Sequence, residues 1–363
     1  MINNLSHTYI IAEAGVNHNG SVEQALGLVD AARHAGADAV KFQTFRTSKL
    51  VSRYAEKAQY QKTTTNASES QFFMLQRLEL SDSDHAVIKA YCEKIGIDFM
   101  SSPFDHESLG VLVNRFNLQL LKLGSGELTN APLLLSLAQT GKPLILSTGM
   151  ATLDEVEEAL GVLAFGYLEL GKPTIEKFRM AFASTSGQEL LREKVTLLHC
   201  TTQYPTPTSD VNLRAMDTLA NSFGLPVGFS DHTEGWVMSL AAVARGACVV
   251  EKHFTLDRTL PGPDHKASLE PAELAQMIDG IRCVEQGLGN GIKGPTSSEM
   301  ENMLVARKSL IAAQTVCKGD LFSEENLTIK RPGNGISPIY YWDYLGKQSK
   351  AHYEMDEVIC DNE

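Results

Sequence analysis

Two short runs in the last third of the chain combine residue types that bind metal ions. The runs are Phe229-Ser230-Asp231-His232 and Glu251-Lys252-His253, and each follows an apolar stretch. Residues i and i+2 share a face of a β-strand, so the serine would point the same way as His232 and the glutamate the same way as His253. Two imidazoles and a carboxylate at neighbouring strand ends predict a metal site with two histidine ligands. Because two ligands leave positions open, the pattern favours a catalytic ion, which Glu251 would bind directly or through a water.

Two lysines lie inside otherwise apolar runs. Lys41 shares a strand face with Gln43, and Lys122 is followed by the turn Gly124-Ser125-Gly126-Glu127. A single lysine in a strand is most often a solvated edge residue. Two of them, among Ser, Thr and turn amides at the ends of other runs, instead predict a pocket for a phosphate or a carboxylate. The polar residues at those ends include Ser102, Thr202 and Tyr204.

The elements that must position these residues alternate between short β-branched runs and amphipathic helical runs. The expected strands are 9–14, 37–44, 98–102, 118–123, 143–148, 195–201, 227–231 and 248–255. The helical segments between them include 22–35, 82–95, 107–116, 153–164, 213–223 and 236–245. Such alternation implies parallel strands with crossover helices, and eight units in under 300 residues predict an α/β fold, a (β/α)8 TIM barrel. A doubly wound open sheet is the alternative.

The histidines and the lysines described above fall near the carboxyl ends of the expected strands. The active site of a (β/α)8 barrel lies at the carboxyl ends of its strands. After the eighth expected strand, the stiff loop 261–266 would present Asp264 over the barrel mouth, although its Pro-Gly-Pro-Asp sequence also makes a simple turn. The loop 15–20 after the first strand is equally good turn material.

Two stretches interrupt the alternation, and a third ends it. Residues 51–80 are too long and polar for an ordinary loop and predict a lid or wall over the active-site face. Residues 168–194 look like an insertion. From 290 to 300 the chain is rich in Gly, Pro and Ser, as a linker would be. We therefore expect a catalytic domain over 1–289 and a small β-rich domain over 301–363, in which Arg331 lies beside a rigid turn.

Composition limits the class of partner. The net charge of −12 argues against general nucleic-acid or anionic-membrane binding, so an anionic substrate would need locally clustered lysines. The six cysteines have no CxxC spacing and are expected to be free thiols in a reducing compartment. The N-terminus has no basic region followed by an apolar core, and no run is long enough to span a membrane. These features predict a cytoplasmic protein.

The motifs together match one family along nearly the whole chain. They are 12–20, 40–44, 122–127, 147–150, 199–207, 229–233, 251–255, 262–265 and 330–335. The chain resembles the sialic acid synthases, which include the bacterial legionaminate and other nonulosonate synthases. Its final segment is similar to the family's C-terminal antifreeze-like (SAF) domain.

The resemblance implies a metal-dependent condensation between phosphoenolpyruvate and an N-acylated mannosamine-type sugar. C3 of phosphoenolpyruvate would attack the sugar aldehyde, water would add at C2, and phosphate would leave with C–O cleavage. The expected product is N-acetylneuraminate, and the rival is legionaminate from a 2,4-diacetamido-2,4,6-trideoxy sugar. Two alternatives come from other classes. A metal-dependent barrel hydrolase leaves Lys41 and Lys122 unexplained. A carbohydrate- or ice-binding protein would survive loss of His232 and His253, whereas the synthase would lose nearly all activity.

The resemblance also implies roles for individual residues. His232 and His253 would bind Mn²⁺ or Mg²⁺, which would polarise the aldehyde. The residues implied for phosphoenolpyruvate are Lys41, Lys122, Ser125, Thr202 and Ser230, with Ser102 a weaker candidate. Those implied for the sugar are Gln43, Tyr204 and Asp264, and Glu127 is a candidate for proton transfer. In the family the small domain caps the barrel of the other subunit, so the resemblance implies a domain-swapped homodimer in which Arg331 contacts the sugar in trans.

Overall fold

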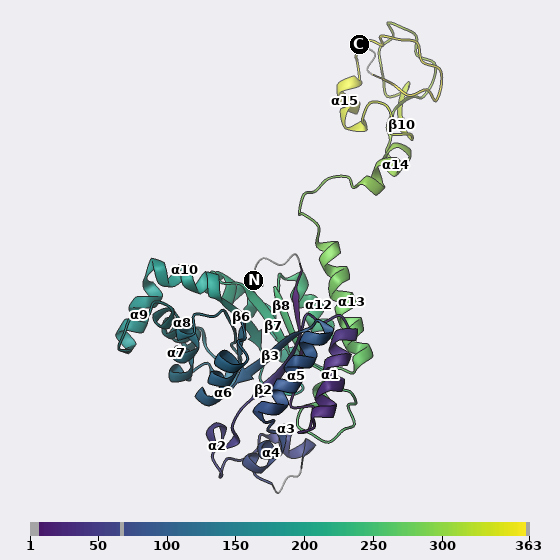
Figure 1. The fold of residues 1–363 in the computed structure, drawn as a ribbon. Helices are drawn as coiled ribbons and strands as arrows, with labels where there is room; N and C mark the ends of the chain where they lie inside the picture. Colours follow the sequence, from purple (N-terminus) through teal and green to yellow (C-terminus); the bar gives the residue numbers. More distant parts are fainter. Residues whose placement is uncertain (1–6, 66–68, 361–363) are drawn as a thin grey trace. The chain divides into compact units, whose positions relative to one another are not determined.

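The first part of the chain is a ring of eight parallel strands surrounded by helices. The computed structural model describes residues 7–65 and 69–360 (Figure 1). The strands are β1 (Tyr9–Gly15), β2 (Ala39–Thr44), β3 (Asp98–Pro103), β4 (Leu121–Leu123), β5 (Leu144–Ser147), β6 (Val195–Cys200), β7 (Val227–Asp231) and β8 (Val249–His253). Their order is β3-β2-β1-β8-β7-β6-β5-β4, and β3 packs against β4 to close the ring. The predicted (β/α)8 barrel is therefore confirmed, and the alternative of an open doubly wound sheet is wrong.

Helices follow the strands and cover the outside of the ring (Figure 1). They are α1 (Val22–His34), α5 (Asp82–Ile95), α6 (His106–Gly110) with its π-helical continuation Val111–Arg115, α7 (Ala131–Gln139), α8 (Leu153–Tyr167), α11 (Ala215–Phe223), α12 (Val237–Ala244) and α13 (Pro271–Leu288). Capping side chains fix the first residues of several helices. Thr152 and Glu155 form a reciprocal capping box at the start of α8. Gly36 follows the last turn of α1 with a φ of +86°, which suits a glycine after a helix end.

Strand alternation divides the core into two parts. Outward side chains of the strands pack against the helices, in a large cluster that includes Phe42, Phe229 and Phe254. Inward side chains form a separate cluster that plugs the barrel. Its buried members are Tyr9, Ile11, Ala39, Met100, Ile145, Leu198 and Val249. This inner cluster, called here the apolar layer, closes the barrel below the carboxyl ends of the strands.

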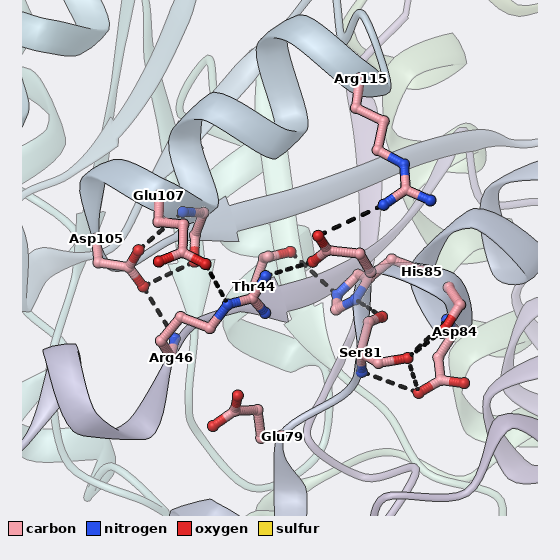
Figure 2. A network of polar contacts seen from close by, with 12 residues as sticks. Thr44, Arg46, Glu79, Ser81, Asp84, His85, Asp105, Glu107 and Arg115 are labelled. Atoms are coloured by element: carbon pink, nitrogen blue, oxygen red, sulfur yellow. Dashed lines mark hydrogen bonds and ion pairs between the residues drawn. The ribbon is translucent and has the colours of Figure 1, made fainter.

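The long connection between β2 and α5 is clamped at both ends. This β2–α5 segment, residues 47–79, holds α2 (Thr47–Leu50), α3 (Gln59–Thr64) and α4 (Gln71–Leu78). Just before it, Arg46 pairs with Glu107 at 3.1 Å (Figure 2). Arg46 also pairs with Asp82 at 2.5 Å. The first residue, Thr47, donates to the last, Glu79, from its backbone N–H and from its hydroxyl at 2.9 and 2.7 Å. The two ends of the segment therefore meet at one place.

The insertion after α8 consists of two further helices, α9 (Ile175–Ala183) and α10 (Thr185–Lys194). Both pack on α8, with the rings of Phe165 and Phe178 edge-to-face at 5.1 Å. Gly161 makes this approach possible, because a Cβ there would lie 3.0 Å from the carbonyl oxygen of Phe178. The insertion is thus an added layer on the outside of the barrel.

The second compact unit begins at Asn290. Its helix α14 (Ser297–Ala306) starts inside the stretch expected to be a linker, and α15 (Tyr341–Tyr344) is a single turn. Strand β9 (Ser309–Ala312) pairs antiparallel with β10 (Leu327–Lys330). The unit has a core of its own, built from Leu310, Ala312, Val316, Phe322, Leu327, Ile336, Tyr353 and Ile359. The prediction of a small β-rich C-terminal domain is confirmed.

In the part of the chain that the structure describes, no helix has both the length and the apolar character needed to cross a bilayer.

Candidate active site

A cavity of about 310 Å³ opens at the carboxyl ends of the barrel strands. It collects all but two of the residues expected from the sequence to form a site. These are Lys41, Gln43, Ser102, Lys122, Ser125, Thr202, Tyr204, Ser230, His232, Glu251, His253 and Asp264. The β2–α5 segment supplies a further wall through Leu50, Val51, Gln61, Gln71, Met74 and Leu75. The wall predicted from the length of this segment therefore lies beside the polar residues.

The polar floor of the cavity lies one step above the apolar layer. Seven of the eight strands present to the barrel interior a polar residue two positions after an apolar one: Glu13 after Ile11, Lys41 after Ala39, Ser102 after Met100, Lys122 after Leu120, Ser147 after Ile145, Cys200 after Leu198 and Glu251 after Val249. We call this set the polar layer. Strand geometry alone puts its members in one ring, because successive inward residues are two apart.

Two buried lysines in the polar layer are held by two buried carboxylates. Lys41 Nζ lies 2.5 Å from Glu13 and 3.6 Å from Glu251, while Lys122 Nζ lies 3.5 Å from Glu251. Burial would raise the pKa of Glu251, but Lys122 and Lys41 outweigh burial and lower it to about 2. Burial lowers the pKa of Lys122, with Glu251 opposing, whereas for Lys41 the two carboxylates outweigh burial and raise the pKa. Glu251 is therefore ionised between the two lysines.

Beside Lys122 the strand ends form a pocket of hydroxyl and backbone donors. Lys122 Nζ donates to Ser147 Oγ at 2.7 Å, and the N–H of Gly149 donates to Ser125 Oγ at 2.9 Å. The hydroxyl of Thr202 is buried without a hydrogen-bond partner. At Gly149 a Cβ would lie 2.5 Å from this hydroxyl and 2.9 Å from Ser125 Oγ, so only glycine leaves the pocket open. An ammonium group and hydroxyls around a small space suit a phosphate or a carboxylate.

The two histidines of the predicted metal site lie side by side. Their ring centroids are 5.6 Å apart, and the ring of Tyr204 packs against both. His232 Nδ1 lies 2.7 Å from the carbonyl oxygen of Thr201, which makes Nδ1 the protonated nitrogen and leaves Nε2 with its lone pair. Burial lowers the pKa of His232 to about 4 and that of His253 well below its ordinary value. Both rings are therefore neutral at pH 7, the form that binds metal ions.

The donor set fits a divalent ion held by two protein ligands. His253 Nδ1 is buried and has no hydrogen-bond partner, and Glu251 Oε2 accepts none either. Ser230 Oγ donates to the other oxygen, Oε1, at 3.1 Å. Across the described ranges 7–65 and 69–360, no group of three or more His, Cys, Asp or Glu side chains is arranged to hold an ion. The fit is thus to an ion that takes its remaining ligands from substrate or solvent.

Asp264 and Gln43 border the cavity on other sides. Burial raises the pKa of Asp264 to about 6, so this carboxyl group can hold or release a proton near neutral pH. Gln43 is half-buried at the end of β2, beneath the wall from the β2–α5 segment. Both residues are placed to contact a substrate that occupies the cavity.

The two remaining candidates lie outside the cavity lining. Glu127 is half-buried, one residue beyond the lining, and accepts from Asn130 Nδ2 at 2.7 Å. Arg331 is exposed in the second compact unit.

The structure also adds residues that the sequence reading left unassigned. Glu13 is almost fully buried and pairs with Lys41, and burial raises its pKa to about 7, although Lys41 opposes the shift. Cys200 Sγ lies 3.0 Å from Ser125 Oγ. The i, i+2 rule that linked Lys41 with Gln43 would have placed Glu13 inward as well, two residues after Ile11. Nothing in the sequence marks Cys200 apart from that same alternation.

Comparison with known proteins gives the chain its family. The NeuB family matches residues 28–293, and a SAF domain matches residues 307–361. The N,N'-diacetyllegionaminic acid synthase of Campylobacter jejuni is 48% identical over 98% of this chain and 99% of its own length. The enzyme of that name from Legionella pneumophila is 45% identical over 94% of this chain and 90% of its own length. A crystal structure of a sialic acid synthetase from Leptospira borgpetersenii, in complex with citrate, matches with a TM-score of 0.66 and 32% identity over 82% of this chain and 90% of that one.

The fold is a (β/α)8 barrel with a cavity at its strand ends, and the named relatives are synthases, so the chain is an enzyme of the (β/α)8 barrel class. The chain belongs to the NeuB family, and its C-terminal unit is a SAF domain. The resemblance stated from sequence motifs is thereby confirmed.

Proposed function

We propose that this enzyme condenses phosphoenolpyruvate with 2,4-diacetamido-2,4,6-trideoxymannose to form N,N'-diacetyllegionaminate and phosphate. Two relatives that share 48% and 45% of their residues with this chain bear the name of that synthase. The matched sialic acid synthetase structure shares 32%. The relatives thus support the rival sugar better than the N-acetylneuraminate expected first from the sequence.

One observation carries the proposal: a cationic pocket lies in the same cavity as two neutral imidazoles. Phosphoenolpyruvate has a phosphate and a carboxylate, and it requires cations in a protein of net charge −12. Lys41 and Lys122 supply them, 5% and 2% exposed in their side chains. The alternative of a metal-dependent hydrolase that works without phosphoenolpyruvate leaves these buried lysines unexplained.

Within this proposal each side chain has a stated task. Lys41, Lys122, Ser125, Thr202 and Ser230 hold the two anionic groups of phosphoenolpyruvate, with Ser102 bonded to Lys41 at 3.2 Å. C3 of the bound enol then forms a bond to the aldehyde carbon of the sugar, water adds at C2, and the C2–O bond breaks to release phosphate. A divalent ion, Mn²⁺ or Mg²⁺, held by His232 and His253 would supply Lewis-acid polarisation of the aldehyde.

Proton transfer and sugar placement fall to other residues. Asp264, with its raised pKa, can give a proton to the former aldehyde oxygen as the carbon–carbon bond forms. Gln43 and Tyr204 orient the sugar in the same cavity. Glu251 stays ionised beside the two histidines, and Glu127 is a further candidate for proton transfer.

The walls of the cavity favour an uncharged, amide-bearing sugar. Among the described lining residues the only cations are Lys41 and Lys122, because His232 and His253 are neutral. Both lysines belong to the phosphoenolpyruvate pocket. The opposite wall combines apolar Leu50, Met74 and Leu75 with the amides of Gln61 and Gln71. Such a wall suits a deoxy methyl group and acetamido groups better than a phosphorylated sugar.

The assembly is part of the proposal. Arg331 lies in the SAF domain, and we propose that this domain caps the barrel of a second copy in a domain-swapped homodimer. Arg331 would then contact the sugar of the other subunit. The exposed side chain of Arg331 supports this arrangement.

Steady-state phosphate release tests the proposal. The full-length protein is assayed with phosphoenolpyruvate, Mn²⁺ and either 2,4-diacetamido-2,4,6-trideoxymannose or N-acetylmannosamine. We expect kcat/KM to be at least about tenfold higher for the diacetamido sugar, and chelation of Mn²⁺ to abolish turnover. A higher value for N-acetylmannosamine would overturn the choice of sugar, and no turnover of either with any divalent ion would overturn the synthase itself.

A further inference from the structure

Each candidate metal-binding histidine directly follows a charged residue whose side chain lies on the other face of the sheet. These two charged residues have opposite signs. Asp231 precedes His232 at the end of β7, and Lys252 precedes His253 at the end of β8. The two strands pair in register with Asp231 opposite Lys252. Lys252 Nζ lies 3.2 Å from Asp231 Oδ1, and neither side chain has any exposed surface.

This ion pair is on the outer side of the barrel wall, away from the cavity. Asp231 Oδ2 accepts a hydrogen bond from Ser239 Oγ of α12 at 2.6 Å. Its other oxygen accepts from the backbone N–H and the hydroxyl of Thr233 at 2.8 and 2.7 Å. Strand alternation puts Ser230 and Glu251, one residue earlier, on the cavity side.

Lys252 also forms a hydrogen bond with the residue that follows His232. Its ammonium group donates to the carbonyl oxygen of Thr233 at 2.6 Å. One side chain of β8 thus joins the residue before His232 to the residue after it. The next residue of β8 after this clamp is His253 itself.

We infer that Lys252 and Asp231 are positioning residues that set the separation and orientation of His232 and His253 for the divalent ion. The inference rests on the metal site in the proposed function. A buried ion pair adds little net stability compared with apolar side chains, so stability alone gives no reason for two charges here. Groups behind metal ligands orient those ligands, and their loss weakens metal affinity by about 10- to 100-fold.

Manganese binding to the full-length protein tests the inference. Bound Mn²⁺ loses the sharp six-line electron paramagnetic resonance signal of the free ion, so a titration gives the dissociation constant without any turnover. The variants are Lys252→Met, the double variant Asp231→Asn/Lys252→Met, and Ser239→Ala, which removes one bond to Asp231 and keeps both charges. Arg282→Met is the control, because it breaks an ion pair with Asp38 that does not involve the histidines.

We expect Lys252→Met to weaken Mn²⁺ binding at least about tenfold. The double variant should unfold at a higher temperature than Lys252→Met, because it leaves no unpaired buried carboxylate, yet it should bind Mn²⁺ as weakly. Ser239→Ala should weaken binding about twofold, and Arg282→Met should leave it unchanged.

Two results would overturn the inference, and they differ in what else they affect. Wild-type Mn²⁺ affinity in Lys252→Met or in the folded double variant would show that the pair is merely structural, while the proposed function stands. Absence of Mn²⁺ binding by the wild-type protein would remove the metal site from the proposed function together with the inference.

Discussion

Two layers of side chains fill the inside of this barrel, and they lie only two residues apart along seven of its eight strands. The apolar layer contains Ile11, Ile145 and Val249, while the polar layer above it contains Glu13, Ser147 and Glu251. Both layers are buried, and both belong to the same strands. The backbone is therefore the same, and only the chemical character of the side chains changes from one layer to the next.

The difference between the layers separates stability from chemistry. Burial of the apolar layer contributes about 25 cal/mol for each Å² removed from water. The polar layer buries ions that gain no such benefit and need one another as partners, as Lys41, Lys122 and Glu251 do. Substitutions in the apolar layer should therefore lower the free energy of unfolding, and substitutions at the polar site should lower activity.

The largest effect is expected at the site above the polar layer. His232→Ala should lower kcat/KM at least about a thousandfold, which corresponds to about 4 kcal/mol of transition-state stabilisation. The measurement is phosphate release with the diacetamido sugar. His199→Ala is the control, because His199 contacts Val211 O outside the cavity at 2.7 Å. Equal losses in the two variants would contradict a special role for His232.

A substitution in the apolar layer should lower stability and leave activity nearly unchanged. Ile145→Ala removes a fully buried side chain and should lower the free energy of unfolding by about 3 kcal/mol. The folded variant should keep kcat/KM within about threefold of the wild type. Urea unfolding and phosphate release give the two numbers. A large loss of activity with unchanged stability would show that the two layers do not divide the tasks in this way.

The mouth of the barrel should also be its acid-sensitive end. Burial lowers the pKa of His18 from 6.5 to about 4, with His85 and His265 lowering it further and Asp84 opposing. Between these values the unfolded chain binds a proton that the folded chain does not, so stability falls as the pH drops from about 6.5 to about 4. His18 alone should account for about 3 kcal/mol of this loss.

His18→Asn checks that prediction. Asparagine cannot take up the proton but can still accept from the N–H of Gly20, as His18 Nδ1 does at 3.0 Å. Unfolding free energies measured at several pH values should show a shallower acid slope in the variant. The same slope in both proteins would assign the acid sensitivity to other groups.

The smallest effect is expected at the start of the strands. Arg282 pairs with Asp38 at 3.2 Å and donates to the carbonyl oxygen of Thr8 at 2.9 Å, both only partly buried. Arg282→Met should lower the free energy of unfolding by about 1 kcal/mol and leave kcat unchanged. A change in kcat would show that this end of the barrel is coupled to the site.

Much of the fold could be predicted because the strands are apolar runs of the right length. The strand expected over 227–231 was found at those residues, and so was the helix over 82–95. Helix α7 received no assignment even though Asn130 caps it and Pro132 lies in its first turn. Its sequence is apolar on most sides, and a short apolar run does not distinguish a helix from a strand. The insertion was recognised as an interruption, but not as two helices that pack on α8.

The candidate site was predictable to the extent that alternation and strand ends define it. Lys41 and Lys122 were found as cations in apolar runs, and the structure places both in one cavity. Their partners could not be predicted, because Glu13 and Glu251 come from strands far apart in sequence. The requirement for glycine at Gly149 depends on side chains at the ends of β4 and β6, which flank β5 in the sheet but are distant in sequence.

The clamp at the base of the β2–α5 segment has a consequence for how such an enzyme can change. Thr47 at the start of the segment donates to Glu79 at its end, and Arg46, just before the segment, pairs with Asp82 of α5 and Glu107 of α6. Closure entropy depends only weakly on the length of a loop whose ends are already fixed. We expect the residues between the ties to tolerate replacement as a cassette, so that a new sugar could be accommodated by exchanging one surface stretch while the catalytic floor stays intact.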